Sequence, residues 1–319
     1  MWKRFLFTIL AALASILLPA CSVTPAPQSE TRSMTDDAGR TISAPIHPTR
    51  IVSLTYGTDE ILTSLLSSAR IRAYSKYAGD DGISFLTKDE VSRVGRTVDM
   101  EPEHILALAP DLVIASTSTP MQTVEVLTHS GIPVYVSAIP TTVEEMKEKV
   151  RGVAKAVHEE EKGEAMVSDM ESKLAALASK LSAVSPDKER VALGMSFRGI
   201  LGKKGTLFSD VLRLAHVKDG AAVYEVPKGA DAYLSLEILP KIDPDVILLP
   251  TWRVKAGDDT KAFEEGLLSN PALREVTAVK ERRLVPFSEK YKYVMSQHVV
   301  DAVEAAARAV YPEVFVTSD

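Results

Sequence analysis

The sequence has a single cysteine, Cys21, so no disulfide can form within the chain. It has only six histidines, at positions 47, 104, 129, 158, 216 and 298, and none shows the spacing of a zinc site. Basic residues are not in excess, because 37 Lys and Arg against 43 Asp and Glu give a formal net charge of −6. This balance argues against nucleic acid as a partner, since such binding needs a basic patch or stripe.

Enzyme motifs are also missing or imperfect. The segment Gly194–Gly199 reads G-x-S-x-x-G, which is one residue longer than the nucleophile elbow of a hydrolase. The later glycines at 199, 202 and 205 do not form a P-loop, because Thr206 follows where a lysine is required. We therefore expect no catalytic site, no metal site and no bound cofactor.

No apolar run is long enough for a comfortable membrane span, which takes about 20 residues. The longest, Phe5–Leu18, follows basic residues at positions 3 and 4 and precedes Leu-Pro-Ala-Cys21. This arrangement resembles a lipoprotein signal peptide over residues 1–20, with Cys21 as the lipidated residue. The alternative is an ordinary secretory peptide with a chance cysteine. We expect export and a lipid anchor at the cell envelope, either periplasmic or on the outer face of the cytoplasmic membrane.

The residues after the cysteine are rich in Ser, Thr, Pro and Gln, which predicts a flexible tether over residues 21–35. Beyond it, short apolar runs alternate with helical patterns, as expected for parallel α/β units. The predicted strands are 50–54, 71–74, 112–115 and 134–136 in the first half, and 191–193, 245–249 and 283–286 in the second. Helices are predicted from 58, through 124–127, over 207–214 and over 297–310.

A long helical region separates the two halves. Thr142-x-x-Glu145 matches a capping box, and a Met/Leu stripe follows over residues 159–183. A helix of that length spans about 37 Å, enough to bridge two domains. We predict an α/β fold with two Rossmann-like lobes, residues 36–158 and 185–319, joined by one long rigid helix, 159–184. The ligand cleft is expected between the lobes.

An internal echo supports two similar lobes. Glu103 begins a short amphipathic segment that ends in Pro110-Asp111 and an apolar strand, and Glu237 begins the same pattern ending in Pro244-Asp245. Each glutamate lies near a predicted helix start, where a carboxylate is stabilised by the helix dipole.

Several segments together resemble the class III periplasmic binding proteins, and the resemblance covers nearly all of residues 35–316. They are Asp36–Ile42, Pro48–Leu54, Val94-Gly95, Glu103–Ala115, Asn270–Leu273 and Ala278–Lys280. The resemblance implies capture of vitamin B12, haem or a ferric siderophore, with little lobe movement. It also implies delivery to an ABC permease dimer with a cytoplasmic ATPase, with Glu103 and Glu237 contacting arginines of the two permease subunits.

In open α/β sheets, ligands bind beyond the carboxyl ends of the strands, and aromatic and cationic residues follow several predicted strands. The candidate ligand-binding residues are Tyr56, Gly57, Tyr77, Arg96, Thr97, Phe197, Arg198, Trp252, Arg253, Lys290 and Tyr291, with Ser116 and Thr117 also at a strand end. Tyr56 and Trp252 are the strongest candidates.

A metal chelate suits this lining, since aromatic rings cover apolar surface and arginine pairs with anionic oxygens. A ferric siderophore is favoured, with cobalamin or haem as alternatives; haem iron could be bound by a Tyr56 phenolate. Two other functions stay open: a ligand sensor or cofactor-assembly module on the same fold, and a surface hydrolase, for which no nucleophile–base pair is evident.

Overall fold

The computed structural model describes residues 30–201, 205–224 and 233–316. The predicted signal peptide and Cys21 lie outside the described residues. The predicted tether overlaps them at its end, where Thr31–Thr35 forms strand β1 and pairs antiparallel with β2, Thr41–Pro45. Residues 31–35 are therefore part of a hairpin rather than of a tether, because Gly39 turns the chain with a positive φ and brings β2 beside β1.

The first lobe is built on a five-stranded sheet in the order β5-β4-β3-β6-β7, and all its pairs are parallel. Every residue of β3, β6 and β7 is buried, as expected for a parallel sheet covered on both faces. Its strands are β3 (Ile51–Ser53), β4 (Ile71–Ser75), β5 (Thr97–Val98), β6 (Leu112–Ser116) and β7 (Val134–Ser137). Its helices are α1 (Tyr56–Leu65), η1 (Ser68–Arg70), α2 (Lys88–Val94), α3 (Pro102–Leu106), α4 (Met121–His129) and α5 (Val143–Ala156).

The second lobe contains a six-stranded sheet whose parallel part, β10-β8-β12-β13, repeats the order β4-β3-β6-β7 of the first lobe. Two short antiparallel strands extend it. Its strands are β8 (Val191–Ser196), β9 (Gly199–Leu201), β10 (Lys218–Asp219), β11 (Tyr233–Leu234), β12 (Val246–Leu249) and β13 (Leu284–Pro286). Its helices are η2 (Pro186–Lys188), α7 (Leu207–Leu214), η3 (Leu236–Ile238), α8 (Leu239–Ile242), α9 (Thr260–Ser269), η4 (Pro271–Leu273), α10 (Thr277–Lys280), α11 (Glu289–Lys292), α12 (Val299–Val310) and η5 (Pro312–Phe315).

The sequence pattern that is repeated in the two lobes also has the same backbone geometry in both. The residue before each Pro-Asp turn has a positive φ, 48° at Ala109 and 47° at Asp243. Each aspartate then ties its strand to the first strand of its own sheet. Asp111 accepts from the backbone N–H of Arg50 at 2.8 Å, and Asp245 accepts from that of Val191 at 2.8 Å. The Pro-Asp motif therefore sets the register of the two central strands in each lobe.

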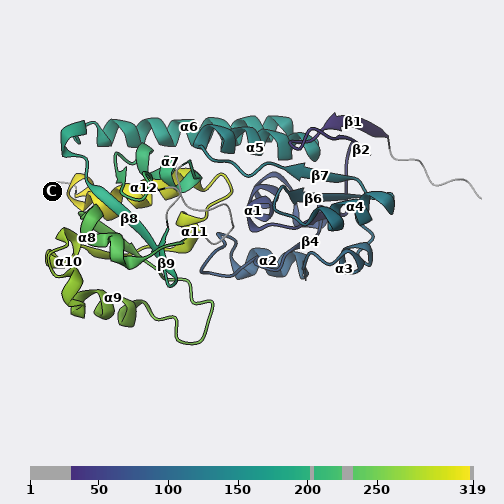
Figure 1. Ribbon diagram of the computed structural model, residues 1–319. Helices are drawn as coiled ribbons and strands as arrows, with labels where there is room; N and C mark the ends of the chain where they lie inside the picture. Colours follow the sequence, from purple (N-terminus) through teal and green to yellow (C-terminus); the bar gives the residue numbers. More distant parts are fainter. Residues whose placement is uncertain (1–29, 202–204, 225–232, 317–319) are drawn as a thin grey trace, which may run out of the picture.

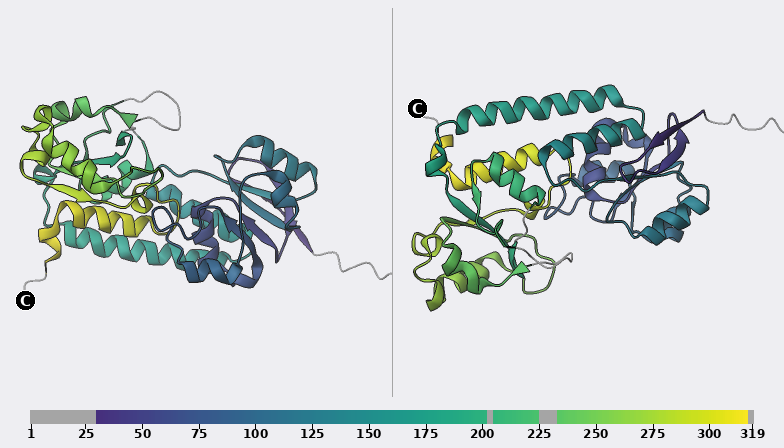
Figure 2. Two further views of the ribbon diagram at one scale, coloured as in Figure 1. Left: turned by 90° about the horizontal axis from the view of Figure 1, so that it is seen from below. Right: turned by 45° about the horizontal axis from the view of Figure 1, so that its top comes forward.

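A long helix, α6 (Glu160–Leu181), joins the lobes and runs along both of them (Figures 1 and 2). It packs against α5 of the first lobe and α12 of the second. One hydrophobic core includes residues of both sheets, such as Ile51 and Ile114 in the first and Leu248 in the second, together with α5, α6, α7 and α12. The predicted α/β architecture of two lobes and a connecting helix is confirmed, and the shared core joins the lobes more firmly than a single helix would.

The capping box predicted at the start of α5 forms only in part. Thr142 accepts a hydrogen bond from the backbone N–H of Glu145 at 3.1 Å, as expected. The Glu145 carboxylate, however, accepts from the backbone and hydroxyl of Thr141 rather than from the backbone of Thr142. Within the three described ranges, no helix is both long and apolar enough to cross a membrane.

Candidate functional site

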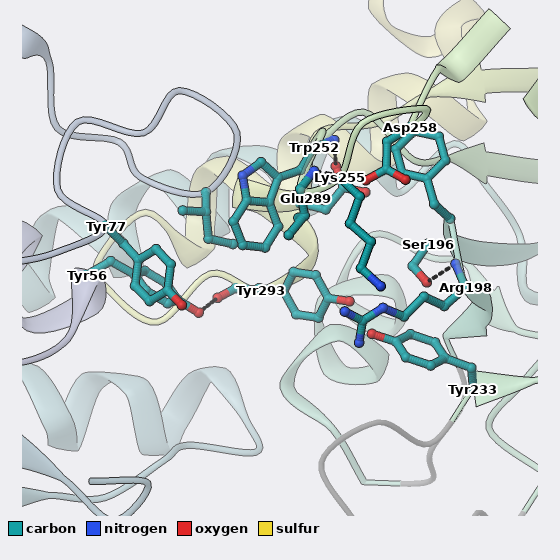
Figure 3. A pocket seen from close by; sticks show the side chains of 13 residues that line it. Tyr56, Tyr77, Ser196, Arg198, Tyr233, Trp252, Lys255, Asp258, Glu289 and Tyr293 are labelled. Atoms are coloured by element: carbon teal, nitrogen blue, oxygen red, sulfur yellow. Dashed lines mark hydrogen bonds between the residues drawn. The ribbon is translucent and has the colours of Figure 1, made fainter. Parts of the chain in front are cut away.

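A pocket of about 540 Å³ lies between the lobes, at the carboxyl ends of strands from both sheets (Figure 3). Its volume is in the usual range for small-molecule sites, about 300–1,000 Å³. The first lobe contributes residues that follow β3 and β4, and the second contributes residues that follow β8 and β12. The lining residues are Tyr56, Tyr77, Ile83, Ser196, Phe197, Arg198, Tyr233, Trp252, Val254, Lys255, Asp258, Glu289 and Tyr293.

The first-lobe wall is aromatic and uncharged. Tyr56 and Tyr77 meet edge to face, with ring centroids 6.5 Å apart. The Tyr56 hydroxyl donates to the backbone carbonyl of Tyr293 at 2.7 Å, which links the two lobes. Burial, together with the nearby Glu60 and Tyr77, raises the pKa of the Tyr56 phenol above its ordinary value. Haem ligation by Tyr56 would therefore require the phenol to lose both its proton and its hydrogen bond to Tyr293.

The second-lobe wall carries the charge. Among the described lining residues, the cations are Arg198 and Lys255, and both side chains point into the pocket, where the hydroxyls of Tyr233 and Tyr293 also lie (Figure 3). The lining carboxylate of Asp258 is engaged by its own loop, accepting from the backbone N–H groups of Val254 and Lys255 at 2.9 and 2.8 Å.

The second lining carboxylate, Glu289, is a buried structural group. It accepts from the backbone N–H groups of Thr251 and Trp252 and from the Thr251 hydroxyl, and it pairs with Lys292 at 3.2 Å. Lys292 also donates to the carbonyls of Met195 and Leu249, at the ends of β8 and β12. Burial lowers the pKa of Lys292 to about 8, although Glu289 opposes this shift. The pair fixes the two strand ends that carry the charged wall.

Trp252 reaches from the second lobe to the first. Its indole N–H donates to the Asp80 carboxylate at 3.2 Å, and its ring contacts Tyr77 edge to face with centroids 6.3 Å apart. Gly82 lies directly beneath the indole, because a Cβ on Gly82 would come within 1.9 Å of Trp252 Cδ1. The absence of a side chain at residue 82 is therefore what allows the ring to lie there.

Outside the pocket lining, buried polar contacts also join the two lobes. The Glu60 carboxylate of α1 accepts from the Ser296 hydroxyl of the second lobe and from the backbone N–H of Phe85. Gln297 donates to the Glu60 carbonyl and to the Ser64 hydroxyl. Glu60 is 2% exposed and Ser296 is 0% exposed, so this inner contact is sealed from solvent.

Five of the residues predicted for the site line the pocket: Tyr56, Tyr77, Phe197, Arg198 and Trp252. The others lie elsewhere. Gly57 is buried inside α1 against Met295, and Arg96 and Thr97 are exposed at the edge strand β5. Ser116 is buried in its own turn, and Thr117 is exposed beside it.

The remaining three were predicted from the loops of the second lobe. Arg253 is exposed and pairs with Asp259 at 3.3 Å. Tyr291 packs against Phe85 and Phe287, and Lys290 lies over the Phe85 and Tyr291 rings. These residues belong to segments that contribute to the pocket, but they are not among its lining residues.

Sequence reasoning missed Ile83, Ser196, Tyr233, Val254, Lys255, Asp258, Glu289 and Tyr293. Ser196 was open to prediction, because it ends the strand before Phe197. Tyr233 was not, because it reaches the pocket through the two-residue strand β11, which carries no sequence pattern of its own.

The pocket serine shows no sign of activation in the described part of the chain. The Ser196 hydroxyl accepts from the backbone N–H of Arg198 at 3.0 Å and contacts the Gly199 carbonyl at 3.5 Å. Within the described ranges, no group of three or more His, Cys, Asp or Glu side chains is arranged to hold a metal ion.

Glu103 and Glu237 lie where the echo places them. Glu103 is in the first turn of α3, and Glu237 is in the 3-10 helix η3 that precedes α8. Both are exposed, and neither forms an ion pair with any described residue. The elements α3 and α8 lie in different lobes, toward opposite ends of the molecule (Figure 1).

Known proteins share this sequence and this architecture. A putative ABC transporter substrate-binding lipoprotein of Bacillus subtilis, YhfQ, is 27% identical over 282 residues, which cover 83% of this chain and 86% of the relative. A probable siderophore-binding lipoprotein of the same organism, YfiY, is 23% identical over 88% of this chain and 89% of its own length.

Among solved structures, the periplasmic haem-binding protein RhuT of Roseiflexus sp. RS-1 superimposes with a TM-score of 0.66 and 22% identity, over 83% of this chain and 98% of that one. The sequence profile described as "Periplasmic binding protein" matches residues 51–291, most of the chain. With two α/β lobes joined by α6, this chain is a member of the periplasmic binding protein family, of class III.

Proposed function

We propose that this protein is the substrate-binding component of an ABC importer and that it captures a ferric siderophore. One observation carries the proposal: an uncharged aromatic wall on the first lobe faces a second-lobe wall that bears Arg198 and Lys255. A siderophore complex has an organic scaffold that aromatic rings can cover and anionic oxygens that Arg and Lys can bind.

The alternatives fit this pocket less well. A corrinoid carries little charge that Arg198 and Lys255 could bind. Haem iron could be bound by the Tyr56 phenolate only after the Tyr56 hydroxyl had lost its hydrogen bond to the Tyr293 carbonyl. The relative named as a siderophore-binding lipoprotein supports the same choice.

The proposal extends to the cell envelope. Cys21 would carry a lipid anchor, so that Cys21→Ser should release the protein from the membrane fraction under high salt. Glu103 and Glu237 would contact the permease dimer, one from each lobe, as their exposure permits.

The ligand is tested by titration of a panel containing ferric citrate, a ferric trihydroxamate, a ferric tris-catechol complex, cobalamin and haemin. In a Trp2→Phe background Trp252 is the sole tryptophan, since the chain has two, so its fluorescence reports on the pocket alone. We expect micromolar or tighter binding of at least one ferric siderophore. Binding of cobalamin or haemin alone, or of nothing in the panel, would reject the siderophore.

The charged wall is tested separately. Arg198→Gln and Lys255→Gln should each weaken an anionic siderophore about tenfold or more, the range expected for hydrogen bonds to charged groups. Lys261→Gln is the matched control, because Lys261 is an exposed lysine of α9 outside the pocket. If the pocket variants bind as tightly as the control, the cations do not recognise the ligand.

A further inference from the structure

We propose that Trp252 is a latch across the mouth of the interlobe pocket, and that Gly82 and Asp80 are the first-lobe positioning residues that hold it shut and so set the rate of ligand exchange. The exchange part of this inference rests on the proposed function of the pocket. The latch itself rests on contacts within the chain.

Two contacts between the lobes differ in their exposure to solvent. Glu60 and Ser296 are almost fully buried, so separating them would expose the Glu60 carboxylate to water. Asp80 is exposed and Tyr77 is 36% exposed, so the contact of these residues with Trp252 borders solvent. The Trp252 contact is therefore the one that can open while the shared core stays intact.

Asp80 and Gly82 of the first lobe together hold the Trp252 indole in place. The two oxygens of the Asp80 carboxylate accept different hydrogen bonds. Oδ1 accepts from the backbone N–H of Gly82 at 2.9 Å, and Oδ2 accepts from the Trp252 indole N–H at 3.2 Å. The first bond shapes the turn that presents Gly82, and the second holds the ring over it. Any side chain at residue 82 must displace the indole, since its Cβ would overlap both Cδ1 and Cγ.

The second lobe holds the latch from its own side. The backbone N–H of Trp252 donates to Glu289 at 2.7 Å, and Glu289 is fixed by Lys292. The backbone of Trp252 is thus anchored to the second lobe, while its side chain depends on the first. Rotation of the Trp252 side chain would therefore break its contacts with the first lobe without moving its backbone.

The experiment uses the full chain with Trp2→Phe, and compares Gly82→Ala and Asp80→Asn with two matched controls. Gly266→Ala adds a methyl group on α9 where nothing lies within 4 Å, and Asp81→Asn removes a neighbouring charge whose side chain is 82% exposed. Thermal unfolding confirms that each variant folds. Acrylamide quenching of Trp252 fluorescence reports the state of the latch without any ligand.

Both latch variants should show a higher quenching constant than wild type, and the controls should not. With the ferric trihydroxamate or tris-catechol complex that binds wild type, stopped-flow dissociation should be about three- to tenfold faster in both latch variants, the factor expected for loss of one hydrogen bond. The association rate should also rise, so that affinity changes less than either rate.

If the quenching constant is unchanged in both latch variants, Gly82 and Asp80 do not hold the indole, and the latch proposal is rejected whichever complex the protein binds. Increased quenching with unchanged dissociation would overturn its control of exchange. If no ferric complex binds wild type, the siderophore assignment fails, and quenching alone still decides whether Gly82 and Asp80 hold the indole.

Discussion

Asp59 is a fully buried carboxyl group in the first turn of α1. Its oxygens accept from the backbone N–H of Ser75 at 3.0 and 3.1 Å and from the Ser75 hydroxyl at 2.6 Å. These bonds tie α1 to the end of β4, next to the turn that carries Tyr77. Burial raises the pKa of Asp59 to about 7, against the lowering effect of the Ser53 and Ser75 hydrogen bonds.

This raised pKa makes stability depend on pH. Between about pH 4 and pH 7 the folded protein keeps a proton on Asp59 that the unfolded chain has released, so the contribution of this residue to stability falls as pH rises through that window. In Asp59→Asn the contribution disappears. The free energy of unfolding of the variant minus that of wild type should therefore increase with pH from 4 to 7, by up to about 1.4 kcal/mol per pH unit.

Urea unfolding at four pH values in this window measures the difference. Asp81→Asn serves as the control for the loss of one carboxyl group, since the Asp81 side chain is 82% exposed. A difference for Asp59→Asn that does not exceed that of the control at any pH would show that Asp59 ionises normally in the folded protein.

Single residues also show the limits of prediction from sequence. Tyr291 was predicted and Tyr293 was not, yet Tyr293 lines the pocket while Tyr291 packs into the core. They are two positions apart at the end of the one-turn helix α11, where Tyr293 is the C-cap residue. A helix turns by about 100° per residue, so side chains two positions apart point in roughly opposite directions. The sequence pattern identified the segment, but only the helical turn decides which tyrosine lines the pocket.

At the scale of elements, apolar runs and spacing were sufficient for the main strands and helices. The predicted helix over 207–214 coincides with α7, and the predicted strand over 112–115 lies within β6. The short antiparallel strands β9 and β11 were missed, because two or three residues give no periodicity to detect. They matter for the site, since β11 brings Tyr233 beside Arg198, with 6.0 Å between the guanidinium and the ring centroid.

The connecting helix α6 comes close to α5 at Gly163, which faces Ala154. A Cβ on Gly163 of α6 would lie 2.4 Å from the Cβ of Ala154 of α5, so the two helices meet where one side chain is missing. Gly163→Ala gains up to about 1 kcal/mol of helix propensity but incurs about 1–3 kcal/mol from overpacking. We expect the free energy of unfolding to fall by about 1 kcal/mol.

Gly266→Ala on α9 provides the comparison, because no atom lies within 4 Å of its added methyl group. It should raise the free energy of unfolding by about 0.5–1 kcal/mol through propensity alone. Both values come from chemical denaturation of the purified proteins. If the two substitutions stabilise the protein equally, α5 and α6 are not in close contact at residue 163.

At the scale of the whole molecule, each lobe presents one exposed glutamate near the start of a short helix, Glu103 in the first lobe and Glu237 in the second. Paired charges at an interface determine orientation and association rate more than raw affinity. We predict that the double variant Glu103→Ala, Glu237→Ala keeps its ligand affinity within about threefold but no longer stimulates the importer's ATPase. Each substitution should change stability by only about 0.3–1 kcal/mol, since each glutamate is an exposed residue in the first turn of a short helix.

The assay compares ligand titration and ATPase stimulation on one preparation, with the importer reconstituted in lipid. The double variant Glu125→Ala, Glu265→Ala also removes one exposed glutamate from each lobe, on α4 and α9, and should stimulate normally. Full stimulation by the Glu103/Glu237 variant would reject the docking role.

The shared core has a consequence for how the chain reaches its final state. Helix α12 ends at Val310, and its buried face completes a core that begins with Met34 in the first hairpin. Each lobe also has a smaller core of its own, within residues 52–136 and 193–284, but the shared core is complete only when α12 has been added. Because contacts far apart in sequence form slowly, we expect the separate lobe cores to form first and the shared core to form last, when α12 packs against α6.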